Sequence, residues 1–342
     1  MKFFIFFWTV ILLVVSVACV PLTVITTPPP TTDAPAPTVN NQPSTLPTSE
    51  NLNGAPKIGG CPIFPADNFW NTPVDNLPVN PLSDAWVASI GRGTGFHMDF
   101  GSGKWDGGPI GIPYNLADAS TPVYKFVFYY PDESDPGPYP IPENYQREWG
   151  SDHHILVVDT STCFLYETYD TSVDNGTWSG GSGAIWDLTS NDLRPAGWTS
   201  ADAAGLPMLP GLVRYDEIAA GEIRHALRFT AENTNGYIWP ARHLTSNDND
   251  PNIPPMGARF RLKISFDVSP FPPEVRVLLR AMQVYGIVLA DNGSNWYVSG
   301  APDLRFDNDM LHLLDVVTWI DFEAVDTSIM MVNPDSGQAH IP

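Results

Sequence analysis

Basic residues are scarce in this chain of 342 residues. Lysine and arginine together number 17, against 38 aspartates and glutamates, which gives a formal net charge of −21. Binding to the phosphates of nucleic acid requires a basic surface, so the composition argues against nucleic acid as a partner. A polyanionic polysaccharide would also be repelled unless a local basic cleft existed. The residues that could form one are Arg224, Arg228, Arg242, Arg259, Arg261 and Lys263.

Cysteine is also scarce, with only three in the chain, and none lies in a CxxC zinc knuckle. Cys19 follows the apolar N-terminal stretch, which leaves Cys61 and Cys163. In an exported protein these two predict a disulfide, which would tie the start of the domain to a central hairpin. Closing a loop of that size is worth about 4–5 kcal/mol in the chain-entropy model. A catalytic thiol is the alternative.

Long amphipathic helices are nearly absent, whereas short strands recur between turn-rich segments. The pattern predicts a mainly β fold: a β-sandwich-like single domain with a few short helices, over residues 57–326. The expected strands are 123–130, 155–158, 164–169, 223–229, 259–266, 287–290, 296–298 and 322–325, and the expected helices are 82–90, 273–285 and 308–316. Asn292-Gly293 predicts a hairpin that pairs 287–291 with 295–299.

The two ends of the chain differ from this domain. Residues 1–19 have the features of a signal peptide, with Lys2 before an apolar run that is short for a membrane-spanning helix. Ala18-Cys19 resembles a bacterial lipobox, so Cys19 is a candidate lipidation site; simple secretion is the alternative. Residues 20–56 are rich in proline and threonine and predict a disordered linker, and 327–342 a C-terminal tail. We therefore expect a secreted or surface protein that meets the membrane only through its signal or lipid anchor.

The central stretch 151–170 predicts two strands joined by a turn at residues 159–162. With that turn, His154 would face Glu167 at the open end of an apolar hairpin. An imidazole beside a carboxylate suits general acid–base chemistry. A structural hydrogen bond between the two is the alternative.

Other candidate residues are spread along the chain. His97 and Asp99 form an HxD pair on an extended segment, which would suit a divalent metal ion or a substrate clamp. Asp99, Asp106 or His225 would complete a catalytic site around His154 and Glu167. No cofactor is identified beyond that metal ion.

Aromatic residues near loops and strand ends predict sugar binding, because their flat apolar faces stack on sugar rings. Trp105 and Trp239 are the candidates for substrate binding, with Arg242 and His243 following Trp239. The alternative is that most of the tryptophans only fill the rim of the fold.

Several long motifs resemble a group of secreted bacterial proteins. They are CPIFPADNFWN, HMDFGSGKWDGGPIGIPY, SDPGPYPIP, SDHHILVVD, LRPAGWTSADAAGLPMLPGLVRYDE, HALRFT, PPMGARFRLK and ADNGSNWYVSGAPD, and together they cover roughly residues 61–326. The chain departs from the group at Asp152-His153-His154, where Asp-Arg-His is expected. Domains of this group can sit beside carbohydrate-binding modules, so the resemblance implies a glycan context by association alone. The group has no established activity, and no functional residue is transferred from it.

These observations together indicate a protein that acts on extracellular polysaccharide, as a glycoside hydrolase or a polysaccharide lyase. A non-catalytic carbohydrate-binding module and a structural cell-surface module are the alternatives. Converging histidine and carboxylate side chains would favour the enzyme, and a flat aromatic strip would favour the binding module.

The lipobox hypothesis gives a direct test. If the Cys19 thiol carries a lipid, Cys19→Ser should move the protein from the membrane fraction to the soluble fraction, because the anchor is lost. Fractionation followed by immunoblotting measures this. Unchanged fractionation would exclude a lipid at that position.

Overall fold

The computed structural model describes residues 54–247 and 249–340. The predicted signal segment, Cys19 and nearly all of the predicted linker lie outside the described residues. Within them, strands outnumber helices, so the prediction of a mainly β fold with a few short helices is confirmed. No helix in the described ranges is long and apolar enough to span a membrane.

The elements are short and follow one another closely along the chain. The strands are β1 (Lys57–Ile58), β2 (Cys61–Pro62), β3 (His97–Asp99), β4 (Lys104–Trp105), β5 (Gly108–Pro109), β6 (Tyr114–Ala117), β7 (Val123–Tyr124), β8 (Phe126–Phe128), β9 (Tyr139–Pro140), β10 (Ile155–Asp159), β11 (Phe164–Tyr169), β12 (Ser172–Asp174), β13 (Thr177–Gly180), β14 (Ser182–Asp187), β15 (Leu227–Ala231), β16 (Arg259–Leu262), β17 (Ile287–Asn292), β18 (Tyr297–Ser299) and β19 (Phe322–Val325). The α-helices are α1 (Ser83–Gly91), α2 (Tyr215–Ala220), α3 (Pro273–Val284) and α4 (Asn308–Leu311), and the 3-10 helices are η2 (Pro131–Glu133), η3 (Leu209–Gly211), η4 (His312–Val316) and η5 (Trp319–Asp321).

The largest sheet has six strands in the order β19-β16-β17-β15-β18-β3. β15 lies between β17 and β18, so the predicted hairpin of 287–291 with 295–299 is wrong. After β17 the chain crosses the end of β15 instead of turning back on itself. The Asn292 side chain donates hydrogen bonds to the carbonyls of Ala231 and Glu232, and the Gly293 amide donates to Ala231. The Asn292-Gly293 turn sequence therefore lies in a connection that passes over β15, and not in a hairpin.

Helix α3 confirms its sequence pattern. It begins at Pro273, where the missing amide costs nothing, and the following Gly286 adopts a φ of 70°. Its buried residues recur with helical spacing, at Val275, Leu278, Leu279 and Met282. They pack the helix against β16 of the six-stranded sheet.

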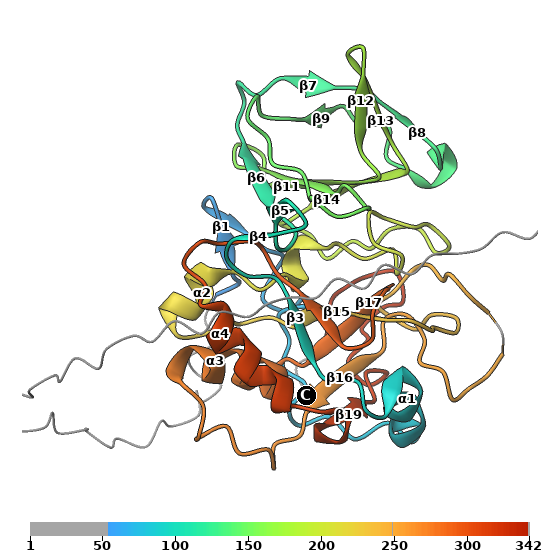
Figure 1. The fold of residues 1–342 in the computed structure, drawn as a ribbon. Helices are drawn as coiled ribbons and strands as arrows, with labels where there is room; N and C mark the ends of the chain where they lie inside the picture. The colour runs from blue at the N-terminus through green and yellow to red at the C-terminus, as the bar shows by residue number, and fades with distance from the viewer. Residues whose placement is uncertain (1–53, 248, 341–342) are drawn as a thin grey trace, which may run out of the picture. The chain divides into compact units, whose positions relative to one another are not determined.

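A second sheet has four strands in the order β14-β11-β10-β6. Every residue of β10 is buried because both faces of this sheet are covered. Leu156 and Val158 join the main core, which also includes the six-stranded sheet. Ile155 and Val157 join a smaller core with Trp178. Figure 1 shows β7, β8, β9, β12 and β13 gathered beyond the four-stranded sheet, where they cover this second face.

The predicted disulfide between Cys61 and Cys163 is confirmed, with their Cα atoms 5.3 Å apart. It joins β2 to the turn that follows β10. The two cysteines are 102 positions apart in the sequence, and the loop that the bond closes includes β3 to β10.

Residues 327–340, which belong to the predicted C-terminal tail, pack on the domain. Met330 is fully buried, and the carbonyl of Gly337 accepts a hydrogen bond from the Phe69 amide. The Trp239 indole donates to the carbonyl of Ser336 at 2.9 Å.

Candidate functional site

One face of the six-stranded sheet carries a row of polar side chains. Ser299 of β18 lies opposite Asp99 of β3, and its hydroxyl accepts a hydrogen bond from Arg228 of β15. Side chains alternate along a strand, so Phe229 and Val298 point the other way, into the main core. We call Arg228, Ser299 and Asp99 the polar row.

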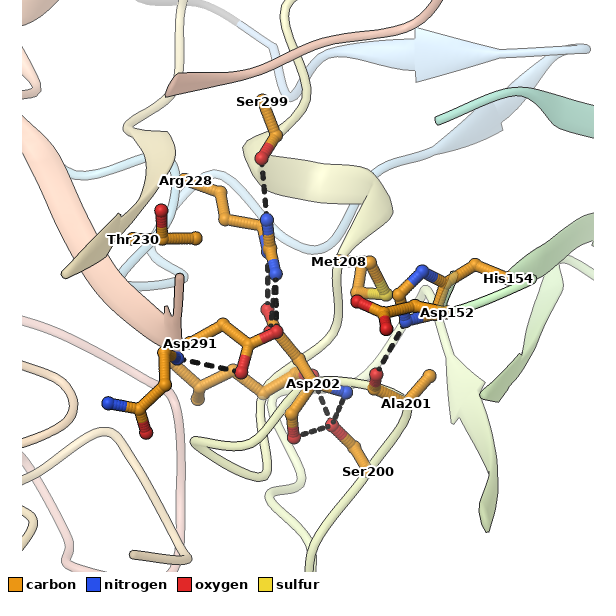
Figure 2. A network of polar contacts seen from close by, with 12 residues as sticks. Asp152, His154, Ser200, Ala201, Asp202, Met208, Arg228, Thr230, Asp291 and Ser299 are labelled. Atoms are coloured by element: carbon orange, nitrogen blue, oxygen red, sulfur yellow. Dashed lines mark hydrogen bonds and ion pairs between the residues drawn. The ribbon is translucent and has the colours of Figure 1, made fainter. Parts of the chain in front are cut away.

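Arg228 is buried at the centre of this arrangement (Figure 2). Its Nε and Nη2 donate to the two oxygens of Asp202, both at 2.7 Å. Nη2 also donates to Asp291 at 3.0 Å, and Nη1 donates to Ser299 at 2.5 Å. A buried guanidinium needs charge partners, and here a single cation has two carboxyl groups in contact with it.

The second carboxyl group cannot ionise easily beside the first. Burial and the negative charge of Asp202 raise the pKa of Asp291 to about 8, although Arg228 opposes the shift. A shift in strand pairing between Phe229 and Thr230 brings Asp291 opposite Thr230. This irregularity carries Asp291 to the Arg228 side of the sheet, where its side chain is 19% exposed.

The segment before β10 supplies a second ion pair. His154 Nδ1 lies 2.5 Å from Glu148 Oε2, and Nε2 lies 3.0 Å from the carbonyl oxygen of Ala201. Since both ring nitrogens face acceptors, the imidazole is held as the cation. Burial lowers the pKa of His154, but the hydrogen bond and charge of Glu148 outweigh it, so the pKa is raised. Burial likewise raises the pKa of Glu148, and His154 outweighs it, so that pKa is lowered.

The predicted partnership of His154 with Glu167 is wrong. Glu167 pairs with Leu156, two residues away from the predicted register, because the turn spans residues 160–163 instead of 159–162. Asp159 is the last residue of β10, and its carboxylate accepts a hydrogen bond from the Ser161 amide. The shift is even, so His154 and Glu167 still share one face of the hairpin. They have different partners on that face.

Glu167 is a buried structural carboxyl group with 0% exposure. It accepts hydrogen bonds from the amides of Met208 and Leu209 and from the Trp186 indole. Burial raises its pKa to about 7, against the lowering effect of these bonds. It links β11 to the loop at η3 and is closed to a polysaccharide.

Asp99 and Glu148 form what we call the acid pair. Burial and the nearby Glu148 charge raise the pKa of Asp99, against the opposing charges of His97 and Arg228. Yet Asp99 is solvent-exposed, and its side chain accepts no hydrogen bond within residues 54–247 and 249–340. Asp99 is therefore open to solvent although its surroundings partly desolvate the carboxyl group. Glu148, whose side chain is 17% exposed, lies near enough for its charge to raise the pKa of Asp99.

His97 lies two residues before Asp99 on β3, and its ring contacts that of Tyr297 at a centroid distance of 4.3 Å. The two side chains of the predicted HxD pair therefore emerge on one side of the strand. In the described residues, no group of three or more histidine, cysteine, aspartate or glutamate side chains could hold a metal ion. His97 and Asp99 are therefore not proposed as a metal site.

Two exposed tryptophans lie beside the acid pair in the chain. Trp105, 77% exposed, is on β4, and Trp149, 55% exposed, follows Glu148 directly. The Trp149 indole donates to the carbonyl of Asp106 and packs on Gly107 and Gly108, and a Cβ at Gly108 would clash with the ring. Asp106 is the turn residue of this hairpin, with a φ of 48°.

The remaining predicted residues have structural partners. His225 is buried against Glu217 and Arg214, in a separate cluster. Arg242 donates to the carbonyls of Arg194 and Pro334, and thus holds the C-terminal segment, as Trp239 does. His243 bonds to the carbonyl of Ala203. These four residues are absent from the polar row and the acid pair.

Glu148 and Asp202 are among the members of the site that were not candidates in the sequence analysis, as are Ser299 and Asp291. Glu148 is one of several acids in a turn-rich stretch, and Asp202 lies in a loop of small residues. Neither position has a periodic signal. Only the closeness of Glu148 to a histidine six residues later could have indicated their pairing.

Comparison with known proteins found no matching family model, curated protein or solved structure. The interpretation of the site therefore depends on its own residues.

The burial of Glu167 predicts a stability effect. Glu167→Gln should lower the free energy of unfolding by about 1–3 kcal/mol, because the new amide nitrogen faces backbone donors and leaves one unsatisfied. Urea unfolding measures this, with the exposed Glu143→Gln as a matched control. Unchanged stability in the Glu167 variant would contradict the structural role.

The raised pKa of Asp291 predicts a pH effect on stability. Its folded pKa of about 8 exceeds the ordinary value of 3.8, so the folded state binds the extra proton. The stability from this group is complete below about pH 4 and is lost as pH rises through about 8. Thermal unfolding from pH 4 to 9 should show a smaller decline for Asp291→Asn than for the wild type. Parallel curves would contradict the shifted pKa.

Proposed function

We propose that the protein is a glycoside hydrolase that acts on extracellular polysaccharide, with Asp99 and Glu148 at its centre. The observation that supports this is the opposite direction of their pKa shifts: Asp99 is raised and Glu148 is lowered. Two neighbouring carboxyl groups whose pKa values are pushed apart can serve as acid and base at one pH. Glycoside hydrolysis uses such a pair on either side of the bond that breaks.

The roles follow from the surroundings of each group. Burial raises the pKa of Asp99, and its side chain has no hydrogen-bond partner within the described ranges, so it is the member of the pair suited to protonate the leaving glycosidic oxygen. Glu148 is ionised because His154 is paired with it, so it can activate a water molecule or attack the sugar. His154 acts through Glu148 as a positioning residue, since its own ring is buried.

A hydrolase is favoured over a lyase because, within residues 54–247 and 249–340, none of the six basic residues proposed to form a basic cleft is free. Lyases act on acidic sugars, whose charge a binding site must balance. The six basic residues that could form such a cleft all have partners in the structure. Arg224 bonds Glu222, Arg228 bonds Asp202, Arg242 bonds Asp335, Arg259 bonds backbone carbonyls, Arg261 bonds Glu323 and Lys263 bonds the carbonyl of Ile320. With a net charge of −21, an uncharged glycan is the better substrate.

The exposed rings of Trp105 and Trp149 support a glycan as ligand, because exposed indoles stack on the C–H faces of sugars. The same rings also favour the second candidate, a carbohydrate-binding module without catalysis. An extracellular location suits both functions, and a disulfide is stable there.

The test is hydrolysis by the purified domain of a panel of neutral and acidic polysaccharides. New reducing ends report cleavage, and absorbance by unsaturated products reports elimination. Asp99→Asn and Glu148→Gln should each lower the rate by roughly 10²–10⁴-fold, the usual contribution of an acid or base. The matched control is Asp106→Asn, an exposed turn acid, which should leave the rate unchanged.

Each other outcome has a defined meaning. Unsaturated products would identify a lyase, and full activity in folded Asp99→Asn or Glu148→Gln would refute the acid pair. Binding of a neutral glycan with no new reducing ends would favour the binding module.

A further inference from the structure

A pocket of about 250 Å³ opens near the acid pair, beyond the ends of β18 and β6. Its walls include the rings of Tyr114 and Tyr215, the apolar edge of Pro302, and the polar side chains of Gln146, Asp216 and Asp303. Two aromatic rings among a few polar groups is the usual composition of a small-molecule site.

The chain connects this pocket to the acid pair by two routes. Gln146 precedes Glu148 by two residues, and the Asp303 amide donates to the carbonyl of Gly101, two residues after Asp99. Two residues span at most about 7 Å of chain. One pocket residue thus lies two residues from Glu148 along the chain, and another is hydrogen-bonded to a residue two positions after Asp99.

The charged side chains around the pocket already have ion-pair partners. Arg214 is buried and donates to Glu217 and to the carbonyls of Leu209 and Leu212. Asp303 and Asp216 both contact the Arg305 guanidinium, at 2.5 Å and 2.8 Å. An anionic ligand would find no free cation here, and a cationic ligand no unpaired carboxylate.

Two uncharged polar groups of the pocket have no hydrogen-bond partner among the described residues. Neither the Tyr114 hydroxyl nor the side-chain amide of Gln146 makes a hydrogen bond within the part of the chain that the structure describes, although the Gln146 backbone amide donates to Asn115. The Tyr114 hydroxyl lies among Arg214, Asp216 and Asp303, which influence its pKa and which also line the pocket. It therefore points toward the pocket. Hydroxyl, amide and aromatic faces together are what an uncharged sugar ring needs.

We propose that this pocket binds one uncharged sugar unit of a glycan whose neighbouring bond lies at the acid pair. The link to cleavage rests on the function proposed above, whereas sugar binding in the pocket can be tested without it. The pocket would fix which sugar units the protein accepts. The acid pair would act on the adjoining bond.

The experiment measures binding by ligand-observed saturation-transfer NMR and calorimetry. The probes are cellohexaose, xylohexaose, chitohexaose and maltohexaose, with hexagalacturonate as the anionic comparison. Wild type and Asp99→Asn are both used, so that binding is followed with and without turnover. Tyr114→Phe and Gln146→Ala should each weaken binding of the preferred neutral probe by roughly tenfold, the value of one lost hydrogen bond. Tyr124→Phe, which removes a half-buried hydroxyl elsewhere, should not change it.

The outcomes separate the two proposals. Loss of binding in the two pocket variants, with none in the control, supports the pocket even if no glycan is cleaved, in which case only the hydrolase proposal fails. Equal binding by the pocket variants and the wild type overturns the pocket, whether or not cleavage occurs. Binding of none of the neutral probes, or preference for hexagalacturonate, also overturns it.

Discussion

The charge of Arg228 cannot be screened by water, and the arrangement around it follows from that constraint. A guanidinium in the middle of a sheet is tolerated only if its donors are used and its charge is balanced. Asp202 meets both needs with two hydrogen bonds, and Ser299 takes a third. Asp291 is then a second carboxyl beside a balanced pair, so it retains a proton to about pH 8. The charge of Arg228 also lowers the pKa values of Asp99, on the edge strand of the sheet, and of Glu148.

Solvent exposure increases along the polar row, from Arg228 to Asp99. Arg228 and Ser299 are buried between the sheet and the loop that carries Asp202, whereas Asp99 on the edge strand β3 meets solvent. Charged groups that are partly buried interact more strongly than charged groups at an open surface, because less water screens them. His154 adds a second fixed cation and lowers the pKa of Glu148, whereas burial and the charge of Glu148 raise the pKa of Asp99. The two carboxyl groups thus differ because of their partners, although their chemistry is the same.

Some of this could be predicted from the sequence. Strand and helix positions such as 322–325 and 273–284 follow from local periodicity, and the disulfide follows from the count of cysteines. The register of the central hairpin failed because Asp159 has turn chemistry but ends a strand. The Asn292-Gly293 hairpin failed because β15 inserts between its arms, which is a long-range choice. Of the site, Asp99 and His154 were predicted, but Glu148 and Asp202 come from irregular loops whose positions depend on the tertiary fold.

The central claim is that the pKa values of Asp99 and Glu148 are shifted in opposite directions, and direct titration tests it. Carbon NMR of selectively ¹³C-labelled side-chain carboxyl groups, followed from pH 3 to 9 and assigned with Asp99→Asn and Glu148→Gln, reports each group separately. The account predicts that Asp99 titrates above the ordinary aspartate value and Glu148 below the ordinary glutamate value. It also predicts that Glu148→Gln moves the Asp99 titration to lower pH, because a like charge has been removed. Both groups titrating at ordinary values, with no response of one to the loss of the other, would contradict it.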